Sequence, residues 1–144
     1  MKNHKVYIIE DNFFYGSIIK SRIENLGYLD VELFTTGEAF MENIHDQPSV
    51  VFIDHVLPDY EGLTILKEIK STYPQIQCIM LSGQEEIKVA IDSLKFGATD
   101  YLVKNADDGA LRINEVIRDC IKINELQSQP KKKRKRLGIL PSFL

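Results

Sequence analysis

Five short apolar runs are spaced along the chain, and helical patterns separate them. The three strongest runs are Val6–Ile9, Val50–Ile53 and Cys78–Leu81. Runs that are apolar on both faces are typical of parallel strands that helices cover on each side of a sheet. Val31–Phe34 and Tyr101–Val103 are weaker runs, which we expect nearer the edges of that sheet.

The segments between the runs carry apolar residues at helical spacing. Gly27, Pro48, Pro74 and Gly97 follow four of these segments and are typical of helix ends. The predicted apolar faces are Tyr15, Ile19, Ile23 and Leu26; Phe40 and Ile44; Leu66, Ile69 and Tyr73; Ile87, Ala90, Ile91 and Leu94; and Ala110, Ile113, Ile117 and Cys120.

A strand followed by a helix, five times over, predicts an α/β fold. The sheet would be parallel, with right-handed crossovers and helices on both faces. In such sheets, ligands bind at the carboxyl ends of the strands, where the strand order reverses. The residues that end the strands are therefore the first candidates for a functional site.

The formal net charge of −3 conceals two parts of opposite sign. Residues 1–130 carry 12 basic and 21 acidic side chains, whereas the run Lys131–Arg136 carries six positive charges. An acidic body argues against a single basic surface for nucleic acid. We therefore divide the chain into a body, residues 1–127, and a basic, partly apolar C-terminal tail, residues 128–144.

Composition excludes several other classes of protein. The chain is 44% hydrophobic, which excludes a disordered chain, and no apolar run is long enough to cross a membrane. The apolar stretch near the N-terminus is too short for a signal peptide, and two cysteines do not make a disulfide framework. We expect a reducing, cytoplasmic setting.

Charged and polar side chains follow four of the runs. Glu10 and Asp11 follow the first run, Asp54 the third, Ser82 the fourth and Lys104 the fifth. Three carboxylates at one edge repel one another unless a cation joins them, and oxygen ligands suit Mg²⁺. An aspartate can also act as a nucleophile and form an aspartyl-phosphate.

Four blocks of residues, in this order, resemble the receiver domain of two-component response regulators. They are Glu10-Asp11, Asp54–Gly62, Ser82 and Lys95–Lys104, and the resemblance covers about residues 5–126. It implies a flavodoxin-like (βα)5 fold with strand order 2-1-3-4-5. It also implies a signalling protein, rather than an enzyme, that takes part only in its own phosphotransfer and dephosphorylation.

The resemblance implies that Asp54 is the phosphoacceptor and that Mg²⁺ is the cofactor. Asp11, Asp54 and the backbone carbonyl of Val56 would bind the ion, and Glu10 would act through a metal-bound water. The phosphoryl donor would be a histidine kinase or a histidine phosphotransfer protein.

Three further residues would bind the phosphoryl group or respond to it. Lys104 would pair with Asp54 at rest and with the phosphoryl group afterwards, while Ser82 would offer its hydroxyl. Tyr101 would change rotamer and alter the face formed by the fourth helix, the fifth strand and the fifth helix. An output protein not identified by sequence would read that face, and a dimer through it is a further expectation.

The chain departs from the family pattern after the lysine. Asn105 stands where receivers usually have a proline in a cis peptide. Because a cis bond before a residue other than proline costs about 2.5–4 kcal/mol, we expect a trans peptide or a strained loop here. Gly83 replaces a frequent alanine, and the first acid is Glu10 rather than aspartate.

The site residues also have structural interpretations. Glu10 and Asp11 could cap the first helix, Ser82 could cap the fourth, and Tyr101 could be ordinary strand packing. His55 follows Asp54 and is interpreted as a loop side chain that tunes access to it.

Two other functions remain open from the sequence. Asn105 favours a receiver-shaped interaction module that works without phosphorylation. The run Lys131–Arg136, followed by the apolar segment Leu137–Leu144, favours an effector that binds nucleic acid or a membrane through its tail.

Overall fold

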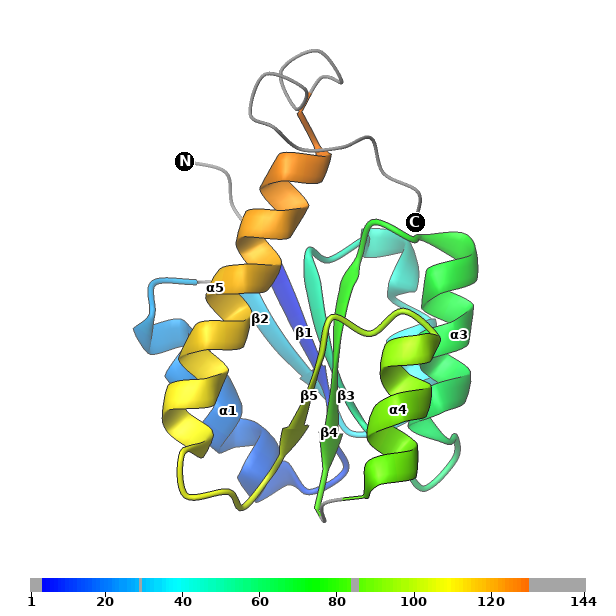
Figure 1. Cartoon of the computed structure of the whole chain (residues 1–144), viewed down its shortest axis with the longest axis vertical. Coiled ribbons are helices and arrows are strands. Elements are labelled where there is room, and N and C mark those ends of the chain that lie inside the picture. The colour runs from blue at the N-terminus through cyan, green and yellow to red at the C-terminus, as the bar shows by residue number, and fades with distance from the viewer. Residues whose placement is uncertain (1–3, 29, 84–85, 130–144) are drawn as a thin grey trace.

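The computed structural model describes residues 4–28, 30–83 and 86–129. Within them, five parallel strands form one sheet in the order β2-β1-β3-β4-β5 (Figure 1). The predicted order is confirmed, and the two weaker apolar runs are the edge strands. The strands are β1 (Lys5–Ile9), β2 (Asp30–Phe34), β3 (Val50–Asp54), β4 (Gln77–Ser82) and β5 (Asp100–Val103).

Helices cover both faces of this sheet. The helices α1 and α5 lie on one face, and α2, α3 and α4 lie on the other (Figure 1). Their bounds are α1 (Phe13–Asn25), α2 (Gly37–Met41), α3 (Gly62–Thr72), α4 (Ile87–Lys95) and α5 (Gly109–Gln127), with a 3-10 turn at Ile44–Asp46.

The central strands supply side chains to two cores. In β3, Val50 and Phe52 pack in the core under α1 and α5, whereas Val51 and Ile53 pack in the core under α2 and α3. All four are fully buried, and each buried side chain of this size contributes about 1.5–3 kcal/mol. This is why the strand is apolar at every position rather than at every second one.

The strand order brings the ends of β1 and β3 together. The two strands are direct neighbours at the centre of the sheet, and Ile9 pairs with Ile53. Glu10 and Asp54 each follow one member of that pair, so their side chains leave the sheet at the same level. The fold therefore places the acidic residues at one rim.

The helix α4 exposes the apolar face that its pattern predicts to be buried. The side chains of Ile87, Ile91 and Leu94 are 74%, 56% and 52% exposed. Val89 and Ser93 are buried instead, and the Ser93 hydroxyl donates a hydrogen bond to the Val89 carbonyl at 2.6 Å. Periodicity identified the helix, but the prediction of its buried face is wrong.

The second predicted helix is shorter than its pattern indicates. The helix α2 ends at Met41, and Ile44 lies in the 3-10 turn that follows. Gln47 then adopts a left-handed backbone with φ of 51°, which turns the chain toward Pro48 and β3.

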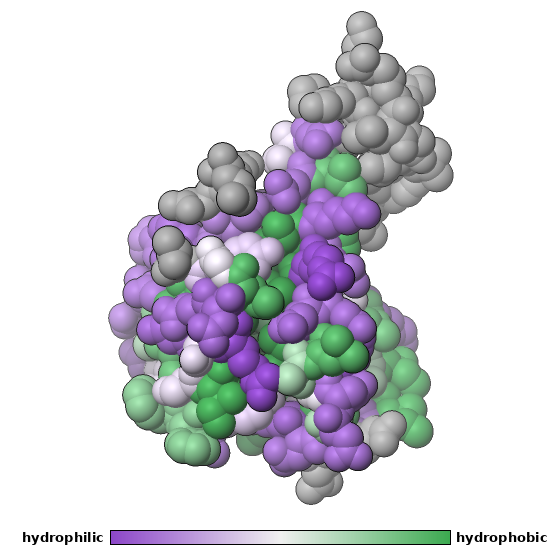
Figure 2. All heavy atoms as spheres, turned by 90° about the vertical axis from the view of Figure 1, so that its left-hand side faces the viewer, coloured by the Kyte–Doolittle hydropathy of each residue, from purple (hydrophilic) through white to green (hydrophobic). Residues whose placement is uncertain are grey.

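One side of the molecule is mostly polar. Figure 2 faces the side of α1 and α5, where hydrophilic residues dominate and apolar residues show between them. In the part of the chain that the structure describes, no helix has the length and apolar character needed to cross a membrane. The helix α5 ends at Gln127, and the run Lys131–Arg136 lies outside the described residues.

Candidate functional site

Three carboxylates meet where β1 and β3 end. Glu10, Asp11 and Asp54 each place an oxygen within 4.8 Å of the others. Glu10 is fully buried and Asp54 is 5% exposed, whereas Asp11 is open to solvent. A set of oxygen ligands with one open side fits a hard divalent cation such as Mg²⁺. The structure thus brings together the acidic residues that the sequence singled out.

Lys104 faces these carboxylates from the end of β5. Its Nζ forms an ion pair with Glu10 Oε1 and lies 3.1 Å from Asp54 Oδ2. Burial alone would lower the pKa of Lys104, but its hydrogen bonds to Glu10 and Asp54 raise the pKa above the ordinary value. One ammonium therefore stands against three carboxylates, and a divalent cation would neutralise the excess negative charge.

Glu10 carries a clear electrostatic cost at the rim. Burial raises its pKa to about 7, and the hydrogen bond with Asp54 adds to this shift. The hydrogen bond from Lys104 and the one from the Asn12 N–H, which reaches Glu10 Oε2 at 3.1 Å, oppose it. A carboxyl group held this way binds a proton near neutral pH, and a cation would displace that proton.

Asn12, rather than either acid before it, caps α1. Its Oδ1 accepts a hydrogen bond from the Tyr15 backbone N–H at 3.1 Å. The alternative interpretation of Glu10 and Asp11 as the helix cap is therefore wrong. The cap leaves both carboxylates available to the rim.

The peptide between Lys104 and Asn105 is trans, because the described residues contain no cis peptide bond. The backbone N–H of Lys104 donates to the carbonyl of Ser82 at 2.8 Å, which ties the end of β5 to the end of β4. With asparagine in the next position, the lysine side chain still reaches Asp54.

Ser82 is buried at the end of β4, one position beyond Leu81, which pairs with Asp54. The helix α4 begins only at Ile87, with Glu86 as the residue before it. Ser82 therefore belongs to the strand end, and the interpretation of Ser82 as the cap of α4 is wrong.

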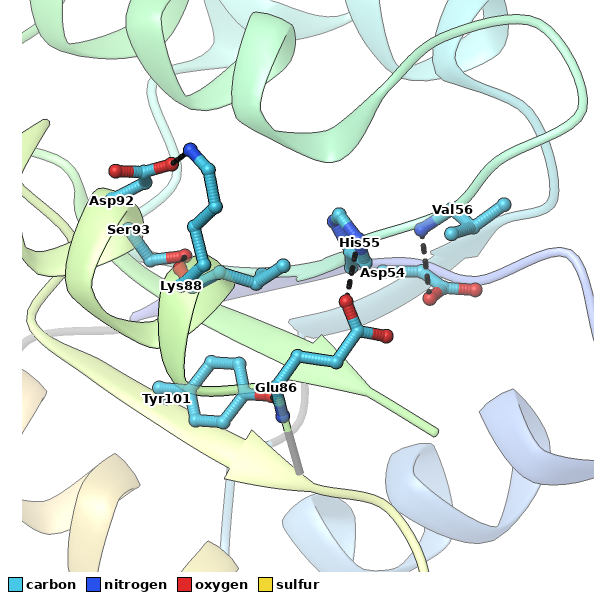
Figure 3. Close-up of polar contacts among 9 residues, drawn as sticks. Asp54, His55, Val56, Glu86, Lys88, Asp92, Ser93 and Tyr101 are labelled. Atoms are coloured by element: carbon cyan, nitrogen blue, oxygen red, sulfur yellow. Dashed lines mark hydrogen bonds and ion pairs between the residues drawn. The ribbon is translucent and has the colours of Figure 1, made fainter. Parts of the chain in front are cut away.

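Tyr101 connects β5 to the start of α4. Its ring packs at the edge of the core under α2 and α3, and its hydroxyl accepts a hydrogen bond from the Glu86 backbone N–H at 3.3 Å (Figure 3). Packing and a polar contact to the segment before α4 therefore occur together at this residue.

His55 and Asp54 point in different directions although they are neighbours in sequence. Figure 3 shows the imidazole directed at Glu86, with 3.8 Å between His55 Nε2 and Glu86 Oε2, while Asp54 faces the backbone of Val56. The Val56 N–H donates to Asp54 Oδ1 at 3.3 Å. The role of His55 in access to Asp54 stays a prediction.

Tyr15 belongs to the site, and sequence reasoning missed it. Lys104 Nζ lies 5.2 Å from the centroid of its ring, and the Tyr15 hydroxyl donates to the Lys104 carbonyl at 3.5 Å. Burial raises the pKa of Tyr15 to about 12, and the charges of Glu10 and Asp54 add to the shift. The available signal was its place in the first helical turn after the acidic pair.

Known proteins match this chain over most of its length. The family model of the response regulator receiver domain matches residues 6–114. The luminescence regulatory protein LuxO of Vibrio campbellii is 26% identical over 126 residues, which are 85% of this chain and 28% of the relative. The transcriptional regulatory protein ZraR of Escherichia coli K12 is 28% identical over 106 residues, which are 73% of this chain and 24% of the relative.

Solved structures share the fold. A CheY-like response regulator receiver domain protein from Methanospirillum hungatei JF-1 superposes with a TM-score of 0.78 at 24% identity, covering 86% of this chain and 98% of that chain. The chain spans about a quarter of the length of the two curated relatives named above.

Proposed function

The chain belongs to the response regulator receiver domain family, and we propose that it accepts a phosphoryl group on Asp54 in the presence of Mg²⁺. The observation that carries this proposal is the setting of Asp54. It is buried at the end of β3, with the Lys104 ammonium at 3.1 Å and the oxygens of Glu10 and Asp11 within 4.8 Å.

The donor we propose is a phosphohistidine on a histidine kinase or a histidine phosphotransfer protein. A carboxylate oxygen of Asp54 would attack the phosphorus, so that a P–O bond forms, the P–N bond breaks and the imidazole of the donor leaves with the electron pair. Asp11, Asp54 and the Val56 carbonyl would hold Mg²⁺, and Glu10 would contact it through water. The ion, when bound, supplies positive charge for the phosphoryl oxygens.

Lys104 and Ser82 would receive the new phosphoryl oxygens. A phosphoryl group adds strong acceptor oxygens, and charge-assisted hydrogen bonds to them are roughly twice as strong as neutral ones. The Lys104 ammonium already lies against Asp54. Ser82, whose backbone carbonyl accepts a hydrogen bond from the Lys104 N–H, lies at the end of the neighbouring strand. The ammonium would therefore exchange one negative partner for another without leaving the rim.

The output we propose is a change in the α4, β5 and α5 face. Tyr101 would give up its hydrogen bond with Glu86 and change rotamer as Ser82 turns to the phosphoryl group. This face contains a cavity of about 680 Å³ beside the exposed Ile87 and Ile91. An output protein, or a second copy of the chain, would bind there in one of the two states.

We also propose that the chain works in the cytoplasm, because Cys78 and Cys120 are free and buried, as suits a reducing compartment. The division into a body, 1–127, and a tail, 128–144, remains a proposal. The tail-mediated alternative depends on Lys131–Arg136, which lies outside the described residues.

The test is the intact mass of the protein after incubation with phosphoramidate and Mg²⁺. We expect the wild-type chain to gain one hydroxylamine-labile phosphoryl group and Asp54→Ala to gain none. Asp92→Asn is the matched control, because Asp92 is a carboxylate on α4 whose partner is Lys88, and it should keep the label. A hydroxylamine-labile label on Asp54→Ala would overturn the assignment.

A further inference from the structure

The loop that follows Asp54 is closed by its own backbone. The Gly62 N–H donates to the His55 carbonyl at 2.9 Å, and Val56 and Glu61 form an isolated antiparallel bridge. Residues 56–61 therefore form one compact unit. Whatever fixes the tip of this loop also restrains Val56, whose carbonyl is a proposed Mg²⁺ ligand.

Asp59 fastens the tip of the loop to the start of α2. Its Oδ1 accepts a hydrogen bond from the Gly37 N–H at 2.9 Å, and its Oδ2 accepts one from the Glu38 N–H at 2.9 Å. The bond from Glu38 is the largest cause of a lowered pKa at Asp59. An ionised carboxylate with two short hydrogen bonds to separate backbone groups makes a directional contact.

Tyr60 adds packing to the same contact. A methyl group built on Gly37 would lie 2.5 Å from Tyr60 Cδ2, so the ring rests directly on the backbone of the first residue of α2. The loop tip thus meets α2 through one carboxylate and one aromatic ring.

The start of α2 is connected in turn to the acidic rim. The turn before this helix begins at the end of β2, where the Phe34 carbonyl accepts a hydrogen bond from the Glu10 N–H at 2.9 Å. Asp59 therefore joins the loop after Asp54 to the segment that is bonded to the backbone of Glu10. The ends of β1 and β3, which carry the proposed ligands, are therefore both connected to the start of α2.

The helix α2 has a cap of its own. The Thr36 side-chain oxygen accepts a hydrogen bond from the Ala39 N–H at 3.1 Å. Asp59 comes from a different segment and binds the two N–H groups before that one. Its contact is therefore an addition to local capping and connects two segments far apart in sequence.

We propose that Asp59 is a positioning residue for the metal and phosphoryl site. It holds the loop 56–61 on α2, so that the Val56 carbonyl is in place before Mg²⁺ binds. Less conformational entropy of the loop is then lost when the ion binds. The proposal rests on the proposed function, because the role of Val56 as a ligand is itself proposed there.

The test compares Mg²⁺ affinity in three variants of the full chain, measured by isothermal titration calorimetry. We expect Asp59→Ala to bind Mg²⁺ about tenfold more weakly, as is typical when a residue that orients a ligand is lost. Asp59→Asn should fall between, because its amide offers only one acceptor oxygen. Thr36→Ala is the matched control: it removes a hydrogen bond from the same end of α2, leaves the loop untouched, and should keep the wild-type affinity.

Hydrogen exchange without Mg²⁺ gives a second readout. Amides in residues 56–61 should exchange faster in Asp59→Ala and at the wild-type rate in Thr36→Ala. Wild-type Mg²⁺ affinity in Asp59→Ala, or an equal loss of affinity in Thr36→Ala, would overturn the role of Asp59 alone. A wild-type chain that binds no Mg²⁺ would overturn the proposed function, and the positioning role with it.

Discussion

The two ends of the sheet are both polar, but in different ways. At the amino ends of the strands, polar side chains pair with one another. His4 Nδ1 and Ser49 Oγ share a hydrogen bond of 2.8 Å, and the Thr99 hydroxyl donates to Gln77 Oε1 at 2.7 Å. Gln77 Nε2 also donates to Gln127 Oε1 at 3.3 Å. This end obeys the rule that buried polar groups find partners.

At the carboxyl ends, like charges are held together instead. Glu10, Asp11 and Asp54 place oxygens within 4.8 Å of one another, and the Lys104 ammonium pairs with Glu10 and Asp54. Burial raises the pKa of Glu10 to about 7. Groups with perturbed pKa values gather at functional sites. The comparison therefore indicates that the unfavourable electrostatics at the carboxyl ends of the strands mark a functional site.

The largest effect on stability should come from Lys104→Met. This change leaves the buried Glu10 and Asp54 without their cation, so we expect a loss of about 3 kcal/mol in the free energy of unfolding. Millimolar Mg²⁺ should recover part of the loss, which urea unfolding with and without the ion measures.

The control is Lys88→Met, because Lys88 forms an exposed pair with Asp92 at 3.2 Å and should cost well under about 1 kcal/mol. Equal losses in the two lysine variants would remove the distinction between the charged rim and an ordinary surface.

The next effect is the pH dependence that Glu10 imposes. Its folded pKa of about 7 lies above the ordinary value of 4.5, so the folded state holds more protons between these values. The stability that this group contributes is complete below pH 4.5 and is lost as the pH rises through about 7.

Glu10→Gln removes the group that titrates. The variant should be about 2 kcal/mol more stable than the wild-type chain at pH 8 and close to it at pH 5, by urea unfolding. If the free energies of unfolding of the two proteins run parallel between pH 5 and 8, Glu10 is not the group whose titration lowers stability.

The smallest effect should come from the amino ends of the strands. Thr99→Val removes the hydrogen bond to Gln77 and should lower the free energy of unfolding by about 1 kcal/mol. The loss should not change with pH between 5 and 8 or with Mg²⁺, because no charge is involved. A loss that depends on Mg²⁺ would mean that the two ends of the sheet are coupled.

Sequence reasoning predicted the sheet and most of the rim for a physical reason. Strands buried on both faces are apolar throughout, so Glu10, Asp54 and Lys104 stand out at the positions where the strands end. The order of the strands followed from the family resemblance, which then placed these ends side by side.

Other features left no pattern to find. The exposed face of α4 depends on which neighbours the helix meets, and Ile91 has the same spacing whether it is buried or open. Asp59 accepts backbone hydrogen bonds from residues 21 and 22 positions earlier. Any residue type except proline would offer the same N–H at the position of Glu38, so the contact leaves no pattern in the sequence. Tyr15 shares its spacing with core residues, so periodicity assigned it to packing.

The most direct measurement is a titration of the ¹⁵N-labelled chain with Mg²⁺, followed by NMR. If the charged rim is a cation site, the amides of Asp11, Asp54 and Val56 shift and saturate at millimolar Mg²⁺, while those of Ser49 and Thr99 stay in place. No shift at Asp11 or Asp54 at millimolar Mg²⁺ would contradict the assignment and favour a receiver-shaped module that works without phosphorylation.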